Sequence, residues 1–368
     1  MKRDWARMAL YAGGFLGPFG GGVVTVLVPD LRTELHTTTA GAAATLSAYL
    51  IPFALLQLVS GTIGERRGLA TTIRTAYLVY AVASVGVALV SSLAPFMALR
   101  AAQGAANAFT TPLLVAALAS MTRPDALGRA MGTFASVQTA GVVFAPLVGG
   151  LAGAVDYRLA FVVPAIVALL LATAPLPDAE RREEPAKLRS ALTRRTRLLS
   201  AFALFGYLST VGLGILVVLR AADEFGVPAG ERGLLLAGFG FAGVLAGRPI
   251  GGLIDRVGPI RVLVAGSALS AAIVPLVGVA GSVALLASTW VVAGLASQML
   301  WGTVYTLAVG AAPENRAGAV SVIGACRFAG NALAPVIWIP IYHAHVWIPF
   351  AIAGAVMAVL ALIGRRFR

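Results

Sequence analysis

Long apolar runs, separated by short polar stretches, follow one another along the whole chain. About twelve of these runs reach the roughly 20 residues that an α-helix needs to cross the hydrocarbon core of a bilayer. The predicted spans lie near residues 8–29, 40–63, 73–92, 94–118, 129–153, 159–176, 197–219, 232–254, 260–280, 283–310, 317–341 and 346–364. Almost none of them has the polar face that a water-soluble amphipathic helix presents to solvent. The pattern therefore predicts an all-α membrane protein with about twelve transmembrane helices.

The composition supports this prediction. Apolar residues make up 59% of the 368 residues, charged residues make up 12%, and the mean hydropathy is +0.88. A water-soluble chain would carry roughly twice that charged fraction. The N-terminal apolar run is too long for a signal peptide and lacks a clear cleavage site, so we interpret it as a retained first helix. Cys326 is the only cysteine, which excludes an internal disulfide.

The net charge of +13 is distributed asymmetrically. If the N-terminus lies on the inner side, the outer loops hold only four of the 28 lysines and arginines, three lie within spans, and the rest fall in the inner loops. The outer four are Arg32, Arg158, Arg220 and Arg232, and the three within spans are Arg100, Arg248 and Arg327. This follows the positive-inside rule and predicts a multi-pass protein of the cell's inner (cytoplasmic) membrane with both termini cytoplasmic. The basic residues are expected to set topology and to contact membrane lipids, not nucleic acid.

A short glycine-rich stretch occurs twice, each time between two apolar runs. Its glycines permit a tight turn. The corresponding residues, 190 positions apart, are Gly61 and Gly251, Glu65 and Asp255, Arg66 and Arg256, and Gly68 and Gly258. A second segment, Gly141–Pro146, recurs at residues 330–335. These repeats predict a duplicated protein with two pseudo-symmetric six-helix bundles. The predicted domains are residues 1–176, a cytoplasmic linker at 177–196, and residues 197–368.

Polar and aromatic residues recur at helical spacing within several spans, which places them on one face of each helix. An arginine inside a span costs at least about 2.5 kcal/mol unless it is paired or wetted, so we expect these faces to line the interior. The candidate substrate-binding residues are Tyr49, Phe53, Gln57, Gln103, Asn107, Tyr207, Gln298, Trp301, Tyr305, Arg327 and Asn331. The alternative is snorkelling for Arg100, near the outer end of its span, and a structural role for Arg248 and Arg327.

The chemistry that is missing excludes other classes of protein. No aspartate or glutamate falls in the middle of a predicted span. The sequence has no Walker loop, no metal-ligand cluster and no arrangement of a nucleophile with histidine. We therefore expect neither an enzyme nor an ATP-driven pump, and no cofactor or metal.

Together these motifs resemble those of the major facilitator superfamily, over essentially the whole chain. The two glycine-rich turns match its loop motif between helices 2 and 3 and between helices 8 and 9. The other matching positions are Arg100, Gln103 and Gly104 in helix 4, and Gly141, Pro146, Gly149 and Gly150 in helix 5, where Ala145 replaces a glycine. The resemblance implies the major facilitator fold, with two bundles that rock around a central site. The helix 5 pattern is typical of the family's exporters.

The resemblance also implies residues for coupling or gating. Glu65 and Asp255 are expected to accept hydrogen bonds from neighbouring helix N-termini and to close the inner face in one state only. The first span lacks the mid-membrane carboxylate of many proton-coupled exporters, so Asp30, paired with Arg100, is a candidate proton-exchanging group. The candidates are Asp30, Gly61, Glu65, Arg66, Gly68, Arg100, Gly141, Pro146, Arg248, Asp255, Arg256 and Gly258.

Three functions remain to be distinguished. The first is a secondary active transporter, expected to work as a monomer by alternating access, that exports small lipophilic or aromatic compounds by proton antiport and so confers multidrug resistance. Its basis is the aromatic stripe that includes Tyr49, Trp301 and Tyr305. The second is an organic-anion exchanger or facilitator, in which Arg327 contacts the anion. The third is a membrane receptor that does not transport.

Overall fold

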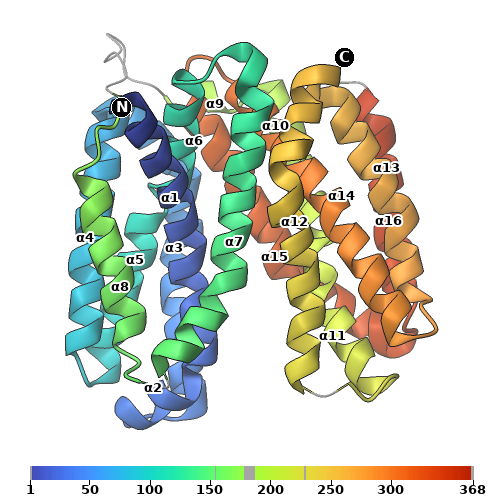
Figure 1. Ribbon diagram of the computed structural model, residues 1–368, viewed down its shortest axis with the longest axis horizontal. Helices are drawn as coiled ribbons and strands as arrows, with labels where there is room; N and C mark the ends of the chain where they lie inside the picture. The colour runs from blue at the N-terminus through green and yellow to red at the C-terminus, as the bar shows by residue number, and fades with distance from the viewer. Residues whose placement is uncertain (1, 154, 178–186, 228, 366–368) are drawn as a thin grey trace. The chain divides into compact units, whose positions relative to one another are not determined.

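The computed structural model describes residues 2–153, 155–177, 187–227 and 229–365, and within these ranges every regular element is a helix (Figure 1). In the N-terminal half the helices are α1 (Lys2–Gly22), η1 (Val23–Val26), α2 (Val28–Glu34), α3 (Thr39–Arg67), α4 (Leu69–Leu89), α5 (Leu93–Asn107), α6 (Thr111–Ser120), η2 (Pro124–Ala126), α7 (Leu127–Gly153) and α8 (Leu159–Ala172). In the C-terminal half they are α9 (Leu188–Ala191), α10 (Arg194–Leu208), η3 (Val211–Leu213), α11 (Gly214–Asp223), α12 (Ala229–Val257), α13 (Pro259–Gly278), α14 (Val283–Val309), α15 (Arg316–Ala344) and α16 (Ile348–Gly364).

Eight helical stretches are long and apolar enough, by length and composition, to cross a membrane. They are Ala44–Arg67, Leu69–Leu89, Pro124–Gly153, Arg194–Asp223, Glu231–Val257, Pro259–Gly278, Val283–Val309 and Arg316–Ala344. Two shorter apolar helices, α8 and α16, coincide with the sixth and twelfth predicted spans. The prediction of an all-α membrane fold is thus confirmed.

Some predicted spans are interrupted helices. The first divides at Gly22, where α1 gives way to the 3₁₀ turn η1, and the seventh divides at η3, which separates α10 from α11. The fourth divides between α5 and α6. The first break follows three consecutive glycines, which are poor helix formers, and the helical hydrogen bonding resumes only beyond it. The two 3₁₀ turns begin at Val23 and Val211, so the interruptions repeat in the two halves of the chain.

The ends of several helices follow from local chemistry. Thr38 caps α3 by accepting a hydrogen bond from the backbone nitrogen of Gly41 at 3.1 Å, and Ser282 caps α14 in the same way. At the two glycine-rich turns, Gly68 has φ of 95° and Gly258 has φ of 89°, a region that favours glycine. These two glycines let α4 and α13 begin directly after α3 and α12.

The described residues divide into two compact units. Unit 1 comprises Met1–Met121, Val137–Thr193 and Ala311–Val322, and unit 2 comprises Thr122–Ser136, Arg194–Gly310 and Ile323–Arg368. The helices α7 and α15 are each divided between the two units. The domains predicted from chain order, 1–176 and 197–368, stay a prediction, and most of the linker between them, residues 178–186, lies outside the described residues.

The same three helix pairs pack together in both units. In unit 1, α5 packs on α3 and on α4, and α4 packs on α8. In unit 2 the corresponding helix α14 packs on α12 and on α13, and α13 packs on α16. Figure 1 shows α4, α5 and α8 as neighbours in unit 1 and α13 beside α16 in unit 2. The repeat detected in the sequence is thus a repeat of helix packing.

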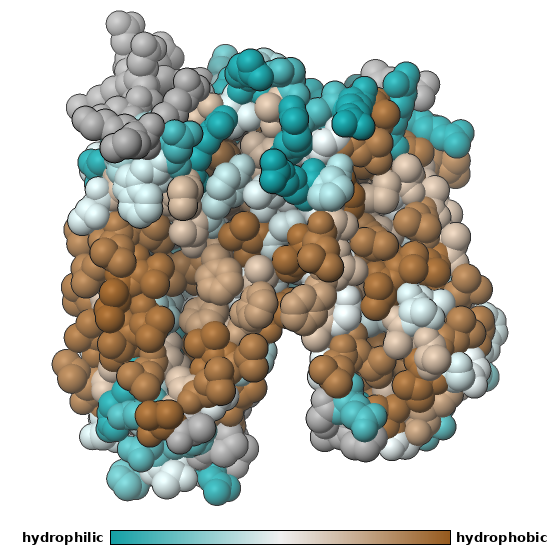
Figure 2. All heavy atoms as spheres, viewed as in Figure 1, coloured by the Kyte–Doolittle hydropathy of each residue, from teal (hydrophilic) through white to brown (hydrophobic). Residues whose placement is uncertain are grey.

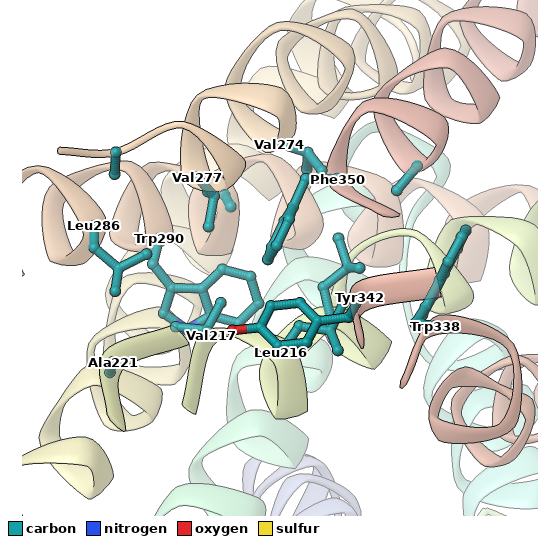
Figure 3. Close-up of a cluster of buried hydrophobic side chains, with 14 of the residues drawn as sticks. Leu216, Val217, Ala221, Val274, Val277, Leu286, Trp290, Trp338, Tyr342 and Phe350 are labelled. Carbon is teal, nitrogen blue, oxygen red and sulfur yellow. The ribbon is translucent and has the colours of Figure 1, made fainter. Parts of the chain in front are cut away.

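The core of unit 2 forms around large aromatic side chains (Figure 3). Trp290 of α14 is 2% exposed and Phe350 of α16 is fully buried, next to Val274 of α13. Trp338 of α15 donates its indole N–H to the carbonyl of Leu208 at 2.9 Å, so its one polar atom is satisfied inside an apolar environment.

The outer surface of the helices carries many large apolar side chains. Leu89 is 78% exposed, Leu245 is 77% exposed and Val82 is 70% exposed. Figure 2 shows hydrophobic residues over the middle of the helices and hydrophilic residues gathered at their ends. Such exposure would be a liability in water, but it is expected for helices surrounded by lipid.

Candidate functional site

Asp255, in the last turn of α12, caps the N-terminus of α7. Its Oδ1 accepts a hydrogen bond from the backbone nitrogen of Gly128 at 2.6 Å, and its Oδ2 accepts one from the backbone nitrogen of Arg129 at 3.0 Å. The side chain of Arg129 adds an ion pair at 3.1 Å, and the Asp255 side chain is only 8% exposed. The first turn of a helix has unpaired N–H groups and a partial positive charge, so a carboxylate is well suited to this position. We refer to these three contacts as the α12–α7 capping contact.

Glu65 occupies the corresponding position at the end of α3. Its Oε1 accepts a hydrogen bond from the backbone nitrogen of Ala317, in the first turn of α15, at 3.1 Å. Asn315 caps the same helix end by accepting from the nitrogen of Gly318 at 2.9 Å, and it donates to Thr62 at 2.9 Å. We refer to the bond between Glu65 and Ala317 as the α3–α15 capping contact. It has one hydrogen bond to the carboxylate where the α12–α7 capping contact has three.

Two glycines let these helices approach closely. A Cβ atom on Gly61 would lie 2.0 Å from the carbonyl oxygen of Ala317, and one on Gly251 would lie 2.5 Å from that of Gly128. Glycine is therefore required at both positions by the neighbouring backbone. The arginines of the two turns, Arg66 and Arg256, are exposed, as is Arg248. The expected bonds between the turn carboxylates and helix N-termini are present in both units, whereas a closing and opening movement stays a prediction.

A buried polar network occupies the interior of unit 1. Tyr49 donates its hydroxyl to the carbonyl of Gly17 at 3.2 Å and accepts from the amide of Asn107 at 2.8 Å. The Asn107 side-chain carbonyl accepts from Thr110 at 2.7 Å. The ring of Phe53 stacks on that of Tyr49, with 6.3 Å between the ring centroids. The residues on the second and fourth predicted spans thus meet within one unit.

Arg100 is the most deeply buried charge among the described residues of unit 1. It donates to the carbonyl of Gly20 at 3.2 Å and to the side chain of Gln103 at 2.7 Å, and its guanidinium lies 4.4 Å from the centre of the Tyr49 ring. It is fully buried, so it does not snorkel to the membrane surface. Among the described residues Arg100 forms no ion pair, so the expected pairing with Asp30, which lies in α2, is absent.

Gln57 is buried in unit 1, but its amide is unused. The residue is 1% exposed, and neither its amide nitrogen nor its amide oxygen has a partner among the described atoms. Its backbone carbonyl accepts hydrogen bonds from Ser60 at 3.3 Å and from Ser321. An unused buried amide is costly, which makes Gln57 available to a polar ligand group.

In unit 2, Arg327 of α15 lies within a cluster of aromatic rings. Its guanidinium carbon lies 5.3 Å from the ring centre of Tyr207, 5.5 Å from that of Trp301 and 4.6 Å from that of Phe328. Arg327 also donates to the hydroxyl of Tyr305 at 2.7 Å. We refer to these four rings and Arg327 as the aromatic cluster. Facing a cation with aromatic rings offsets part of the cost of burying it.

Arg327 has no carboxylate partner within the part of the chain that the structure describes. It is 7% exposed, and its Nε has no hydrogen-bond partner among the described atoms. Asn331, one turn further along α15, is exposed, and no contact joins it to the aromatic cluster in the described ranges. Gln298 of α14 instead donates to the carbonyl of Gly132 in α7 at 3.4 Å. Of the candidates on these helices, only Trp301, Tyr305 and Arg327 therefore converge with Tyr207.

The glycine-proline motif of the fifth predicted span lies in α7. A Cβ atom on Gly141 would lie 2.5 Å from the carbonyl oxygen of Phe15 in α1, so this glycine permits close helix packing. A Cβ atom on Gly330, the corresponding residue of α15, would lie 2.2 Å from the carbonyl oxygen of Leu204 in α10. Pro146 lies inside α7 and is exposed. The repeated segment thus brings a backbone close to a glycine in both halves of the chain.

Several polar residues that complete these networks were not predicted from the sequence. Asn315 is fully buried although it caps a helix, and an asparagine directly before a helix start could have identified it. Ser321 donates to the carbonyl of Gln57 from α15, and Ser84 accepts from Gln103 at 2.6 Å. No local pattern distinguishes these two serines from the many others in apolar helices.

Comparison with known proteins identifies the family. The family model of the Major Facilitator Superfamily matches residues 10–216 and 198–368. The multidrug efflux protein YfmO of Bacillus subtilis is 26% identical over 382 residues, which cover 99% of this chain and 93% of that protein. The tetracenomycin C resistance and export protein of Streptomyces glaucescens is 26% identical over 150 residues, which cover 40% of this chain and 28% of that protein.

A solved structure shows the same fold. The human organic anion transporter MFSD10 (TETRAN) superposes with a TM-score of 0.82 at 15% sequence identity, covering 99% of this chain and all of that one. The family resemblance inferred from the turns and helix motifs is thus confirmed. These matches support a transport role. They give no support to the third function considered above, a membrane receptor that does not transport. The chain belongs to the Major Facilitator Superfamily, a family of multi-pass membrane transporters and not of enzymes.

Proposed function

We propose that this protein exports small lipophilic or aromatic compounds by alternating access, with proton antiport as the driving reaction. The observation that carries the proposal is the aromatic cluster of unit 2, in which Tyr207, Trp301 and Tyr305 converge within a membrane-embedded unit. Aromatic side chains with a few polar groups are the usual lining of sites for small organic ligands. Relatives named as a multidrug efflux protein and as a tetracenomycin C resistance and export protein support the same direction and substrate class.

The positive charge of Arg327 restricts which compounds can bind at the aromatic cluster. Arg327 is permanently cationic and has no carboxylate partner in the described part of the chain. Its charge repels a lipophilic cation placed among the same rings, whereas a neutral aromatic compound can stack on them. We therefore expect neutral aromatic compounds to bind better than lipophilic cations.

The two capping contacts supply the gate in this proposal. Asp255 and Glu65 hold the first turns of α7 and α15, and hydrogen bonds to a charged acceptor contribute about 1.5–3 kcal/mol each. If the helices separate in another state of the transport cycle, both carboxylates lose these partners. Both termini are expected in the cytoplasm, so the gate lies on the cytoplasmic side, and the protein is expected to work as a monomer.

Proton coupling needs a carboxylate that changes its environment during the cycle. Among the described residues, the acidic residues of the predicted gate are Glu65, at the end of α3, and Asp255, at the end of α12. Asp30, the other candidate, lies in α2. Asp30 and Arg100 form no ion pair in the described structure. The simplest arrangement for proton exchange at the outer end, an aspartate paired with this arginine, is therefore absent. Opening of the proposed gate would replace the backbone N–H partners of Glu65 and Asp255 by water, so these two carboxylates change their environment during the cycle.

Ligand-induced stabilisation tests the substrate class. A compound that binds only the folded protein raises its apparent stability by mass action. We would measure the melting temperature of the purified protein with neutral aromatics, lipophilic cations and organic anions, at two pH values. Stabilisation by neutral aromatics should be lost in Trp301→Ala and kept in Trp347→Ala, a change at a tryptophan that is 54% exposed. Equal stabilisation of both variants would contradict a site at the aromatic cluster.

Organic-anion transport is a second candidate, because the unpaired guanidinium of Arg327 could bind a carboxylate. Its Nε has no partner among the described atoms and is free to donate. In that case anions alone should stabilise the protein, Arg327→Gln should abolish the effect, and Arg327→Lys should keep part of it. Anion binding that survives in Arg327→Gln would exclude this candidate.

A further inference from the structure

A groove on unit 2 combines three arginines with an apolar wall. It has a volume of about 550 Å³ and is lined by Arg129, Arg248, Pro249, Gly252, Leu253 and Arg256. All but Arg129 belong to α12, and Arg129 lies in the first turn of α7. No acidic residue is among the lining residues that the structure describes, so the groove is strongly electropositive.

The spacing along α12 explains the shape of the groove. Arg248, Gly252 and Arg256 follow one another at four-residue steps and so lie on one face of the helix. Gly252 leaves a gap between the two arginines, and a Cβ atom there would lie 3.7 Å from the side chain of Arg129. Arg248 and Arg256 are about 12 Å apart along the helix axis, from the rise of about 1.5 Å per residue. A phosphate group fits between such cationic side chains.

The charges in the groove are largely uncompensated. Arg129 pairs through its Nε with Asp255, at 3.1 Å. Within the described ranges Arg248 and Arg256 form no ion pair, and both are exposed. A guanidinium group can bind a phosphate through two parallel hydrogen bonds, so this pair of arginines suits an anionic phosphate ligand.

The apolar side of the groove indicates a lipid. Leu245, Pro249 and Leu253 form a second stripe at four-residue steps, directly beside the arginine stripe. Leu245 is 77% exposed and Leu253 is 41% exposed, and Pro249 is also exposed. The arginines lie towards the end of α12, where hydrophilic residues replace the hydrophobic ones (Figure 2). A soluble anion would use the arginines alone, whereas a phospholipid would use both stripes.

We propose that this groove binds one anionic phospholipid, with its phosphate between Arg248 and Arg256 and an acyl chain along Leu245, Pro249 and Leu253. Basic residues at a membrane surface attract anionic lipid, and each contributes about a fivefold factor in affinity. Arg129 borders the phosphate position while it keeps its bond to Asp255. The site is separate from the aromatic cluster, so it does not depend on the proposed substrate.

The test compares lipids on the purified protein in detergent, with melting temperature and native mass spectrometry as readouts. Phosphatidylglycerol should raise the melting temperature and be retained as a single bound lipid. Phosphatidylcholine should not be retained, and neither phosphatidylcholine nor inorganic phosphate should raise the melting temperature. In the double variant Arg248→Gln and Arg256→Gln, the affinity for phosphatidylglycerol should fall about 25-fold. Arg261→Gln is the matched control, because Arg261 lies on α13 and outside the groove.

A second variant tests the same groove without removing an arginine, and so does not depend on whether the double variant folds. Gly252→Leu fills the gap between the arginines and leaves the charge unchanged, and Gly252 has no neighbour closer than 3.7 Å to a Cβ atom among the described residues. It should weaken phosphatidylglycerol binding, whereas Arg261→Gln should not. Equal binding by the groove variants and the control would overturn the site. Full stabilisation by inorganic phosphate alone would overturn the assignment to a lipid, and equal retention of phosphatidylcholine would overturn the requirement for an anion.

Discussion

Replacing Asp255 with asparagine should weaken the α12–α7 capping contact more than the equivalent change at Glu65 weakens its counterpart. The Asp255 carboxylate accepts two backbone hydrogen bonds at 2.6 and 3.0 Å and is almost buried. A charged acceptor contributes about 1 kcal/mol more per bond than a neutral one. Loss of the interaction with the helix N-terminus adds about 0.3–1 kcal/mol. The ion pair adds at most about 1 kcal/mol, because the side chain of Arg129 is 53% exposed.

These contributions sum to about 2–4 kcal/mol, which corresponds to a shift of about 30-fold to 700-fold towards separation of α12 from α7. The same change at Glu65, to glutamine, affects one hydrogen bond of 3.1 Å and the interaction with the N-terminus of α15, and should cost about 1–2 kcal/mol, or about fivefold to 30-fold. The predicted asymmetry between the two variants is the quantity to measure. It follows from the number of hydrogen bonds and not from the shared sequence motif.

Cysteine labelling measures this opening. Ser136 of α7 is 7% exposed and donates to the carbonyl of Gly243 in α12, so a cysteine there becomes reactive only when the two helices separate. The assay uses Ser136→Cys in a Cys326→Ala background and a membrane-impermeant maleimide, because Cys326 is the only native cysteine. Asp255→Asn should raise the labelling rate at least about 30-fold. Glu65→Gln, which acts on the contact between α3 and α15, should change the rate far less. An unchanged rate in Asp255→Asn, or equal rates in the two variants, would refute the reasoning.

Three further changes have clear expected outcomes. His36 has φ of 48° where the corresponding residue of the second half, Gly226, is a glycine, so His36→Gly should stabilise the protein by about 0.5–1 kcal/mol in thermal unfolding. Asn315→Ala removes a buried helix cap and should cost about 1–3 kcal/mol, more than Thr38→Ala at an exposed cap, and equal melting temperatures would contradict this. Gly251→Ala places a Cβ atom 2.5 Å from a backbone oxygen and should abolish the capping contact, whereas Gly252→Ala should be tolerated, as labelling of the buried cysteine would show.

Much of the fold could be predicted because membrane helices are identified by their length and hydropathy. The duplicated turn also predicted where a carboxylate would meet a helix N-terminus, and Asp255 and Glu65 do so. In contrast, the breaks within the first, fourth and seventh spans could not be located from hydropathy. A 3₁₀ turn keeps the same apolar composition as the helix that it interrupts, so only the neighbouring glycines give a hint.

The candidate sites were predicted less completely, because helical spacing identifies a shared face but not its neighbour. Tyr49 and Asn107 were found on separate stripes, and their hydrogen bond could not be predicted. Arg100 was expected to pair with Asp30, because both lie near the outer ends of their predicted spans, yet Arg100 bonds to Gly20 and Gln103 instead. Phe328, beside Arg327, was not predicted because an aromatic residue in an apolar helix is ordinary.

Transport into inverted membrane vesicles tests the central claim most directly. Vesicles that contain the protein and carry an imposed pH gradient should accumulate a neutral aromatic compound, and a protonophore should abolish the accumulation. Trp301→Ala should reduce the initial rate, whereas Trp347→Ala, at an exposed tryptophan, should leave it unchanged. Accumulation no greater than in vesicles without the protein would contradict export of aromatic compounds, and accumulation that does not depend on the pH gradient would contradict proton antiport.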